Sequence, residues 1–116
     1  MKHTPVLFAE GFLFPEAPRW HAGRQQFIVS DIDRGQVFAV STDGQREQVY
    51  QGPDWVSGTA FENEKTLLVT NARSRSLVRV HLDQPDTAVE MVASLAEIAP
   101  YGINDMVCTP AGVCFI

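Results

Sequence analysis

Two polar residues lie where they could take part in chemistry. Glu16 follows a proline in an otherwise apolar stretch, directly before an expected strand, and has no obvious partner nearby in the sequence. A carboxylate that points into a protein channel needs a cation or a donor to offset its lost hydration. Asn104 offers a neutral oxygen at the matching place two repeats later, and Ca²⁺ favours such mixed carboxylate and amide oxygens. From the residues alone, an alternative stays open: Glu16 is a surface acid and Asn104 forms a turn.

A third candidate, Ser57, stands directly before Gly58. The sequence contains no Gly-x-Ser-x-Gly elbow, and no base is placed to activate this hydroxyl, so we do not expect a nucleophile. We expect Ser57 to serve close packing of the second repeat, with pocket lining as a secondary role. We interpret the stretch 31–35 as a polar turn between strands rather than a calcium loop, and His21 as a turn residue rather than a base.

The elements that position these residues form a repeat. Short apolar segments with many β-branched residues predict strands over 26–31, 36–40, 45–50, 66–71, 76–80 and 88–92. Val29 and Val69 are 40 residues apart, and so are Val40 and Val80. A third copy begins at 104–107, turns at 109–112 and enters 113–116. Trp20 and Phe61 occupy the same place in the first two copies, and we expect both to be core aromatics.

This pattern predicts an all-β protein. The only helix-like stretch, 94–99, ends at Pro100 and is expected to be a single turn at most. A period near 40 residues with about four strands per unit is typical of a β-propeller blade. A β-sandwich also fits the number of strands but does not explain the repeat. We therefore expect antiparallel four-stranded blades, with the first strand of each blade lining a central channel.

The length allows only part of such a ring. Closed propellers have about four to eight blades, whereas 116 residues hold about two and a half repeats of this length. We expect one N-terminal propeller fragment over 1–116, with blades near 14–53, 54–99 and an incomplete 100–116. Because the sequence stops inside an apolar strand at Ile116, we expect it to be part of a longer propeller.

Composition excludes several classes of protein. Nine Lys and Arg against fourteen Asp and Glu give a formal net charge of −5, which argues against a nucleic-acid partner. No apolar run approaches the length of a membrane span, and no secretory leader opens the chain. We therefore expect a cytoplasmic protein without a membrane partner. Cys108 and Cys114 lie in apolar runs and are interpreted as free, buried thiols, with a disulfide or a metal pair as the alternative.

The stretches 11–20 and 27–37, followed by 57–61 and 102–107, resemble the senescence-marker-protein/gluconolactonase family. The Pro-Glu-x-Pro-x-Trp and Asn-Asp-x-x-Val motifs carry most of the likeness, which extends from Gly11 to the end. Members of that family are six-bladed propellers with one divalent metal in the channel, and they hydrolyse sugar lactones and related esters. The present chain has Gly102 where sugar-lactone hydrolysing members often carry arginine.

The resemblance implies roles for the candidate residues. Glu16 would be a ligand of the metal, most simply Ca²⁺, with Zn²⁺ or Mg²⁺ as alternatives, and Asn104 would contact substrate or metal. The metal would polarise the carbonyl of a lactone or ester substrate and lower the pKa of a bound water. The family's remaining ligands and its general base belong to later blades, so no catalytic residue is expected within this chain.

Two hypotheses about function follow. The first is the N-terminal part of a divalent-metal-dependent hydrolase of the lactonase type. The second is a non-catalytic propeller fragment, truncated or degenerate, that acts as a binding or interaction module. In either case, open blade edges favour self-association.

Overall fold

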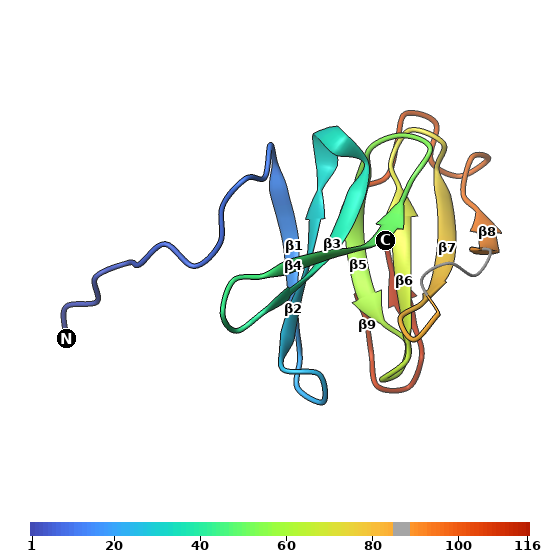
Figure 1. The fold of residues 1–116 in the computed structure, drawn as a ribbon. Helices are drawn as coiled ribbons and strands as arrows, with labels where there is room; N and C mark the ends of the chain where they lie inside the picture. The colour runs from blue at the N-terminus through green and yellow to red at the C-terminus, as the bar shows by residue number, and fades with distance from the viewer. Residues whose placement is uncertain (85–88) are drawn as a thin grey trace.

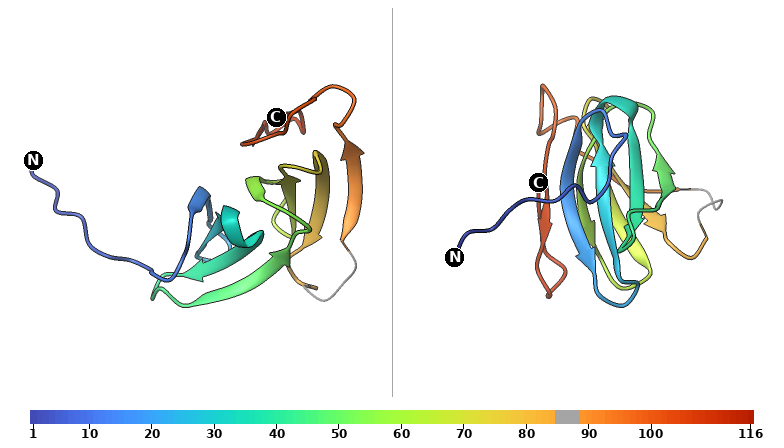
Figure 2. Two further views of the ribbon diagram at one scale, coloured as in Figure 1. Left: turned by 90° about the horizontal axis from the view of Figure 1, so that it is seen from above. Right: turned by 60° about the vertical axis from the view of Figure 1, so that its left-hand side comes forward.

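The computed structural model describes residues 1–84 and 89–116. Two four-stranded antiparallel sheets lie side by side, and a two-stranded hairpin lies next to the second sheet (Figures 1 and 2). The first sheet has the order β1-β2-β3-β4 and is formed by Pro15–His21, Gln26–Asp31, Gln36–Ser41 and Arg46–Gln51. The second has the order β5-β6-β7-β8 and is formed by Val56–Phe61, Thr66–Asn71, Ser76–His81 and Glu90–Ser94.

The expected strands are confirmed to within a few residues. The strand predicted over 88–92 is found at Glu90–Ser94, and residue 88 lies outside the described residues. The stretch 31–35 is a turn, as expected: a short 3₁₀ segment, Ile32–Arg34, joins β2 to β3. It ends at Gly35, whose φ of 64° favours glycine.

The 40-residue repeat corresponds to a structural repeat. Val29 pairs with Phe38 in the first sheet, and Val69 pairs with Val78 in the second. Both inner strands also carry an irregularity at the same place, between Glu16 and Arg19 in β1 and between Val56 and Thr59 in β5. Each sheet is therefore one blade, built on the same register.

The core lies between the two blades. Strand β5 packs against both β1 and β2 of the preceding blade. Ile28 and Val37 from the first blade are fully buried, as are Val56, Leu67 and Val69 from the second. Because a fully buried aliphatic side chain contributes about 1.5–3 kcal/mol, this interface accounts for much of the stability. It also fixes the inner strands relative to each other.

The hairpin consists of β9 (Val107–Cys108) and β10 (Cys114–Phe115), and β9 contacts β5. Our interpretation of the cysteines as free thiols is wrong, because Cys108 and Cys114 form a disulfide. The two residues are paired directly across the hairpin, which brings their side chains together.

Two expectations about aromatic residues have different outcomes. Phe61 is partly buried and packs against the main core, as expected. Trp20 is 42% exposed, so its assignment to the core is wrong. Its ring packs at a tilt against Phe27 near the surface of the first blade instead. Among the described residues, no helix is long and apolar enough to cross a membrane.

Candidate functional site

Glu16 is the second residue of β1 and is exposed. The irregularity between Glu16 and Arg19 follows it directly, and Ala17 there has a φ of 46°, which is uncommon for a residue other than glycine. A bulge of this kind redirects the neighbouring side chain and is frequent next to active sites. The Glu16 carboxylate forms no hydrogen bond or ion pair with any residue that the structure describes.

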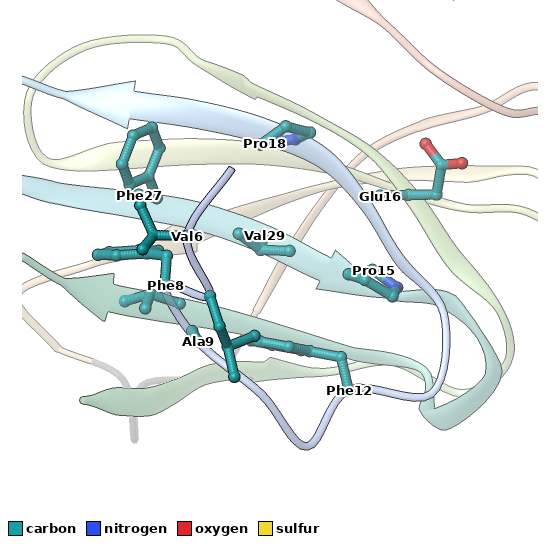
Figure 3. Close-up of a pocket in the computed structure, with 11 residues that line it drawn as sticks. Val6, Phe8, Ala9, Phe12, Pro15, Glu16, Pro18, Phe27 and Val29 are labelled. Atoms are coloured by element: carbon teal, nitrogen blue, oxygen red, sulfur yellow. The ribbon is translucent and has the colours of Figure 1, made fainter. Parts of the chain in front are cut away.

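Glu16 lies beside a largely apolar pocket of about 390 Å³ between the first blade and the N-terminal segment. Its carboxylate points away from the aromatic side chains that form the pocket walls, Phe8, Phe12 and Phe27 (Figure 3). Much of one wall comes from the N-terminal segment, where Val6 is 89% exposed. This pocket therefore does not connect Glu16 with the other candidate residues.

Ser57 and Asn104 are brought together. Ser57 is only 3% exposed, and its hydroxyl donates to the backbone carbonyl of Asn104 at 2.9 Å. The same carbonyl accepts a second hydrogen bond, from the Thr70 hydroxyl at 2.8 Å. Ser57 and Asn104 both line a second pocket, of about 330 Å³. The Asn104 side chain is exposed and makes no hydrogen bond within the described part of the chain.

The first blade is joined to the second in the same way. The Ser30 hydroxyl lies 3.0 Å from the carbonyl oxygen of Glu16 and 2.8 Å from that of Ser57. Ser30 and Thr70 are 40 residues apart and occupy equivalent positions of β2 and β6. Glu16, Ser57 and Asn104 are thus equivalent positions of three consecutive repeats. Ser30 bridges the backbone carbonyls of Glu16 and Ser57, and Thr70 bridges those of Gly58 and Asn104. We call this row the hydroxyl-bridged seam.

Gly58 allows the third repeat to approach this closely. A Cβ atom at Gly58 would lie 2.7 Å from the carbonyl oxygen of Asn104 and 2.9 Å from the backbone of Asp105 and Met106. Such distances are too short for any other residue. The close packing that we expected around Ser57 is present in this contact.

Arg19 links the first blade to the third repeat. Its guanidinium donates to the Asp105 carboxylate at 2.9 Å and to the Met106 carbonyl at 3.0 Å. Arg19 therefore reaches past the intervening strand β5 and holds the segment that carries Asn104. Sequence reasoning missed Arg19, Ser30 and Thr70. The 40-residue spacing could have indicated Ser30 and Thr70, whereas no local signal indicates Arg19.

We expected His21 to be a turn residue, and this is wrong. It is the last residue of β1 and is largely buried. One ring nitrogen lies 2.7 Å from the carbonyl oxygen of Glu64, and the other accepts the Arg24 amide at 3.2 Å. Both nitrogens are thus occupied by backbone groups. This agrees with our expectation that His21 is not a base.

The candidate oxygen donors fit a hard cation only in part. Glu16 and Asn104 each keep a side-chain oxygen without a partner among the described residues, as a metal ligand requires. No group of three or more His, Cys, Asp or Glu able to hold a metal occurs in the part of the chain that the structure describes. A tight calcium site has six to eight oxygen ligands, so this segment contains too few for one.

Residues 14–116 match the family described as SMP-30/Gluconolactonase/LRE-like region. Two solved structures are similar over most of the chain. A gluconolactonase from Xanthomonas campestris has a TM-score of 0.72 and 17% identity, over 89% of this chain and 34% of its own. A structural-genomics protein given the provisional name gluconolactonase has a TM-score of 0.70 and 25% identity, over 90% of this chain and 36% of its own. No curated protein sequence gives a significant match.

The chain therefore spans about a third of the length of these two proteins. Together with the two blades and the hairpin, the similarity identifies the fold as part of a β-propeller, as the repeat predicted.

Proposed function

Because the chain belongs to the SMP-30/gluconolactonase/LRE-like family, we propose that it forms the first blades of a divalent-metal-dependent hydrolase of lactones or related esters. The observation that carries the proposal is the hydroxyl-bridged seam. At equivalent positions of the first and third repeats, it carries a carboxylate and an amide that have no side-chain partner among the residues that the structure describes. Donors on neighbouring inner strands face a common axis in a propeller.

In this proposal, Glu16 and Asn104 contribute two oxygen ligands, with Ca²⁺ as the preferred ion. When bound, the ion supplies Lewis-acid activation of the substrate carbonyl and of the attacking water. Ser57 and Thr70 hold the Asn104 backbone through their hydroxyls. Arg19 fixes the adjacent Asp105. These residues position the amide without contacting substrate.

With two oxygen ligands, the 116-residue segment is not expected to catalyse hydrolysis by itself. Two side-chain oxygens bind Ca²⁺ weakly, and in this proposal the general base belongs to later blades. We therefore expect no chelator-sensitive lactone hydrolysis by the 116-residue chain. Hydrolysis that EDTA abolishes would contradict this division of the site among more blades.

Calcium titration of the 116-residue chain, followed by NMR, tests the role of Glu16. We expect Ca²⁺ to shift the side-chain amide signals of Asn104 in the wild type but not in Glu16→Gln, because the variant lacks the charged ligand. Glu10→Gln is the matched control, since Glu10 is also exposed but lies outside the first blade. Equal shifts in wild type and Glu16→Gln would refute the proposed metal site.

A further inference from the structure

The pocket of about 330 Å³ that Ser57 and Asn104 line has walls from three consecutive repeats. Its volume lies within the range of small-molecule sites, which begins near 300 Å³. The walls are apolar and consist of Phe14 and Ile32 from the first repeat, Trp55 and Ala72 from the second and Ile103 from the third.

The repeat explains why space is left at this position. The Ile32 amide donates to the Phe14 carbonyl at 3.0 Å, and the Ala72 amide donates to the Trp55 carbonyl at 2.6 Å. Phe14 and Trp55 are therefore equivalent, and each stands two residues before its seam residue. In the third repeat, Gly102 stands two residues before Asn104. The aromatic ring that the first two repeats carry is thus absent from the third.

The walls are held in place by other contacts. The guanidinium of Arg73 lies 3.9 Å from the centre of the Trp55 ring, within the range of a cation–π contact. The Asp54 carboxylate accepts the amides of Arg73 and Ser74, both at 3.0 Å. The Ile103 amide donates to the Ala72 carbonyl at 3.1 Å. Ligand binding therefore requires little ordering of the pocket.

Few polar groups are available to a ligand here. The Ser57 hydroxyl is already bonded to the Asn104 carbonyl and lies 3.1 Å from the Thr70 hydroxyl. Among the described residues that line the pocket, the Asn104 amide and the exposed carboxylate of Asp33 are the polar side chains that remain. The carboxylate disfavours anionic ligands, and the walls cannot satisfy several ligand hydroxyls. A hydroxyl buried without a partner weakens binding.

We propose that this pocket selects lactones that carry an alkyl or aryl substituent over polyhydroxylated sugar lactones. The substituent lies between Trp55 and Ile103, and the ring carbonyl lies toward Asn104. This substrate class rests on the proposed function, because it presumes that Asn104 faces the reacting ester.

Binding measured in EDTA tests the pocket without the metal. The chain has two tryptophans, so Trp20→Phe leaves Trp55 as the sole indole reporter. We expect δ-nonalactone to change Trp55 fluorescence saturably. Freshly dissolved glucono-δ-lactone, which has the same ring with hydroxyl substituents, should bind at least about tenfold more weakly, because each buried CH₂ favours binding.

Two variants in the Trp20→Phe background place the binding site. Ala72→Leu fills the pocket and Ile103→Thr makes its wall polar, and each should weaken nonalactone binding at least about fivefold. Ala111→Leu, the same substitution at an exposed turn residue, should leave it unchanged. Circular dichroism establishes whether each variant is folded. If one of the two pocket variants is unfolded, the binding measured for the other tests the site.

Equal or tighter binding of gluconolactone overturns the proposal. So does nonalactone binding that both folded variants leave unchanged. Because these measurements contain no metal, a negative result here together with a positive calcium titration rejects only the substrate class. Selective nonalactone binding together with a negative calcium titration rejects the metal site but supports the apolar pocket.

Discussion

The two blades share a register but differ in how their outer strands are covered. Val49 in β4 and Val92 in β8 occupy equivalent positions, where the pairing with the neighbouring strand shifts by one residue. Val49 is 7% exposed because it packs into the core between the blades, whereas Val92 is 40% exposed. The comparison teaches that an outer-strand side chain is buried by the next blade and not by its own sheet.

The composition of the two edges follows the same division. At the neighbouring equivalent position, β4 has the exposed polar residue Gln48 and β8 has Met91, which is 62% exposed. Strand β4 also begins with the charged pair Arg46 and Glu47. Charged and polar residues protect a sheet edge from pairing with another chain. The edge of the second blade lacks most of this protection.

The buried polar anchors of the blades differ as well. Asp31 is fully buried, and its carboxylate accepts the amides of Leu13 and Phe14, at 3.1 and 2.8 Å. Asn71 stands 40 residues later and accepts the Tyr50 hydroxyl at 2.9 Å. Burial raises the pKa of Tyr50 above its ordinary value of 10.0. A charged group anchors the first blade and a neutral one the second.

The largest expected effect comes from removing the buried polar side chains, Asp31 in the first blade and Asn71 in the second. Asp31→Ala should lower the free energy of unfolding by about 3 kcal/mol, because it removes charge-assisted bonds to two amides. Asn71→Ala should lower it by about 1.5 kcal/mol, because it removes two neutral hydrogen bonds, one accepted from the Tyr50 hydroxyl and one donated to the Ser76 hydroxyl. Urea denaturation followed by tryptophan fluorescence measures both. Equal losses would mean that the charge of Asp31 contributes nothing beyond a neutral acceptor.

An intermediate effect concerns the two edges. We expect the chain to self-associate through β8, and Val92→Lys should weaken this association by about tenfold, because a lysine on an edge opposes strand pairing. Sedimentation equilibrium measures it. Gln48→Lys in β4 makes the same change in charge and should have no effect. A wild-type protein that stays monomeric at all concentrations would show that β8 is protected in another way.

The smallest effect concerns an ion pair on the second blade. Arg79 donates to Glu62 at 2.6 and 2.5 Å and to Glu90 at 2.7 Å. The equivalent residue of the first blade is Ala39. The hydrogen bond from Arg79 lowers the pKa of Glu62 below its ordinary value of 4.5. The stabilisation is therefore fully present above about pH 4.5 and is lost as the pH falls through the folded-state pKa.

We expect Arg79→Met to cost about 0.5 kcal/mol at pH 7, because the pair is partly exposed and screened by solvent. The difference from wild type should be smaller at pH 3 than at pH 7, because Glu62 is protonated as the pH falls. Urea denaturation at both pH values measures it, with the exposed Lys65→Met as the control for a lost surface charge. A difference of the same size at both pH values would assign the effect to packing of the arginine stem.

The repeat made most of the fold predictable from the sequence. Strand positions depend on local patterns of apolar residues, and the spacing from Val29 to Val69 aligns the two blades. The disulfide was missed because an apolar run does not tell a buried thiol from a paired one. The turn over 109–112 places Cys108 opposite Cys114 in the hairpin, so the expected hairpin register could have indicated it.

The site was predictable only in part. The hydroxyl-bridged seam depends on the contacts between blades, which no local pattern contains. Arg19 and Asp105 are 86 residues apart, and only the curvature of the assembled blades brings them together. The exposure of Trp20 has the same origin, because whether its ring is covered depends on which other segments pack against the first blade.

In the hydroxyl-bridged seam, the residues that donate hydrogen bonds and the residues that accept them differ in how freely their side chains can be replaced. Ser30 and Thr70 must keep a hydroxyl, whereas Glu16 and Asn104 offer only the carbonyl that every amino acid possesses. An acid or an amide can therefore replace another side chain at these points without loosening the joint between blades. The scaffold leaves the positions of Glu16 and Asn104 open to new chemistry while its architecture stays the same.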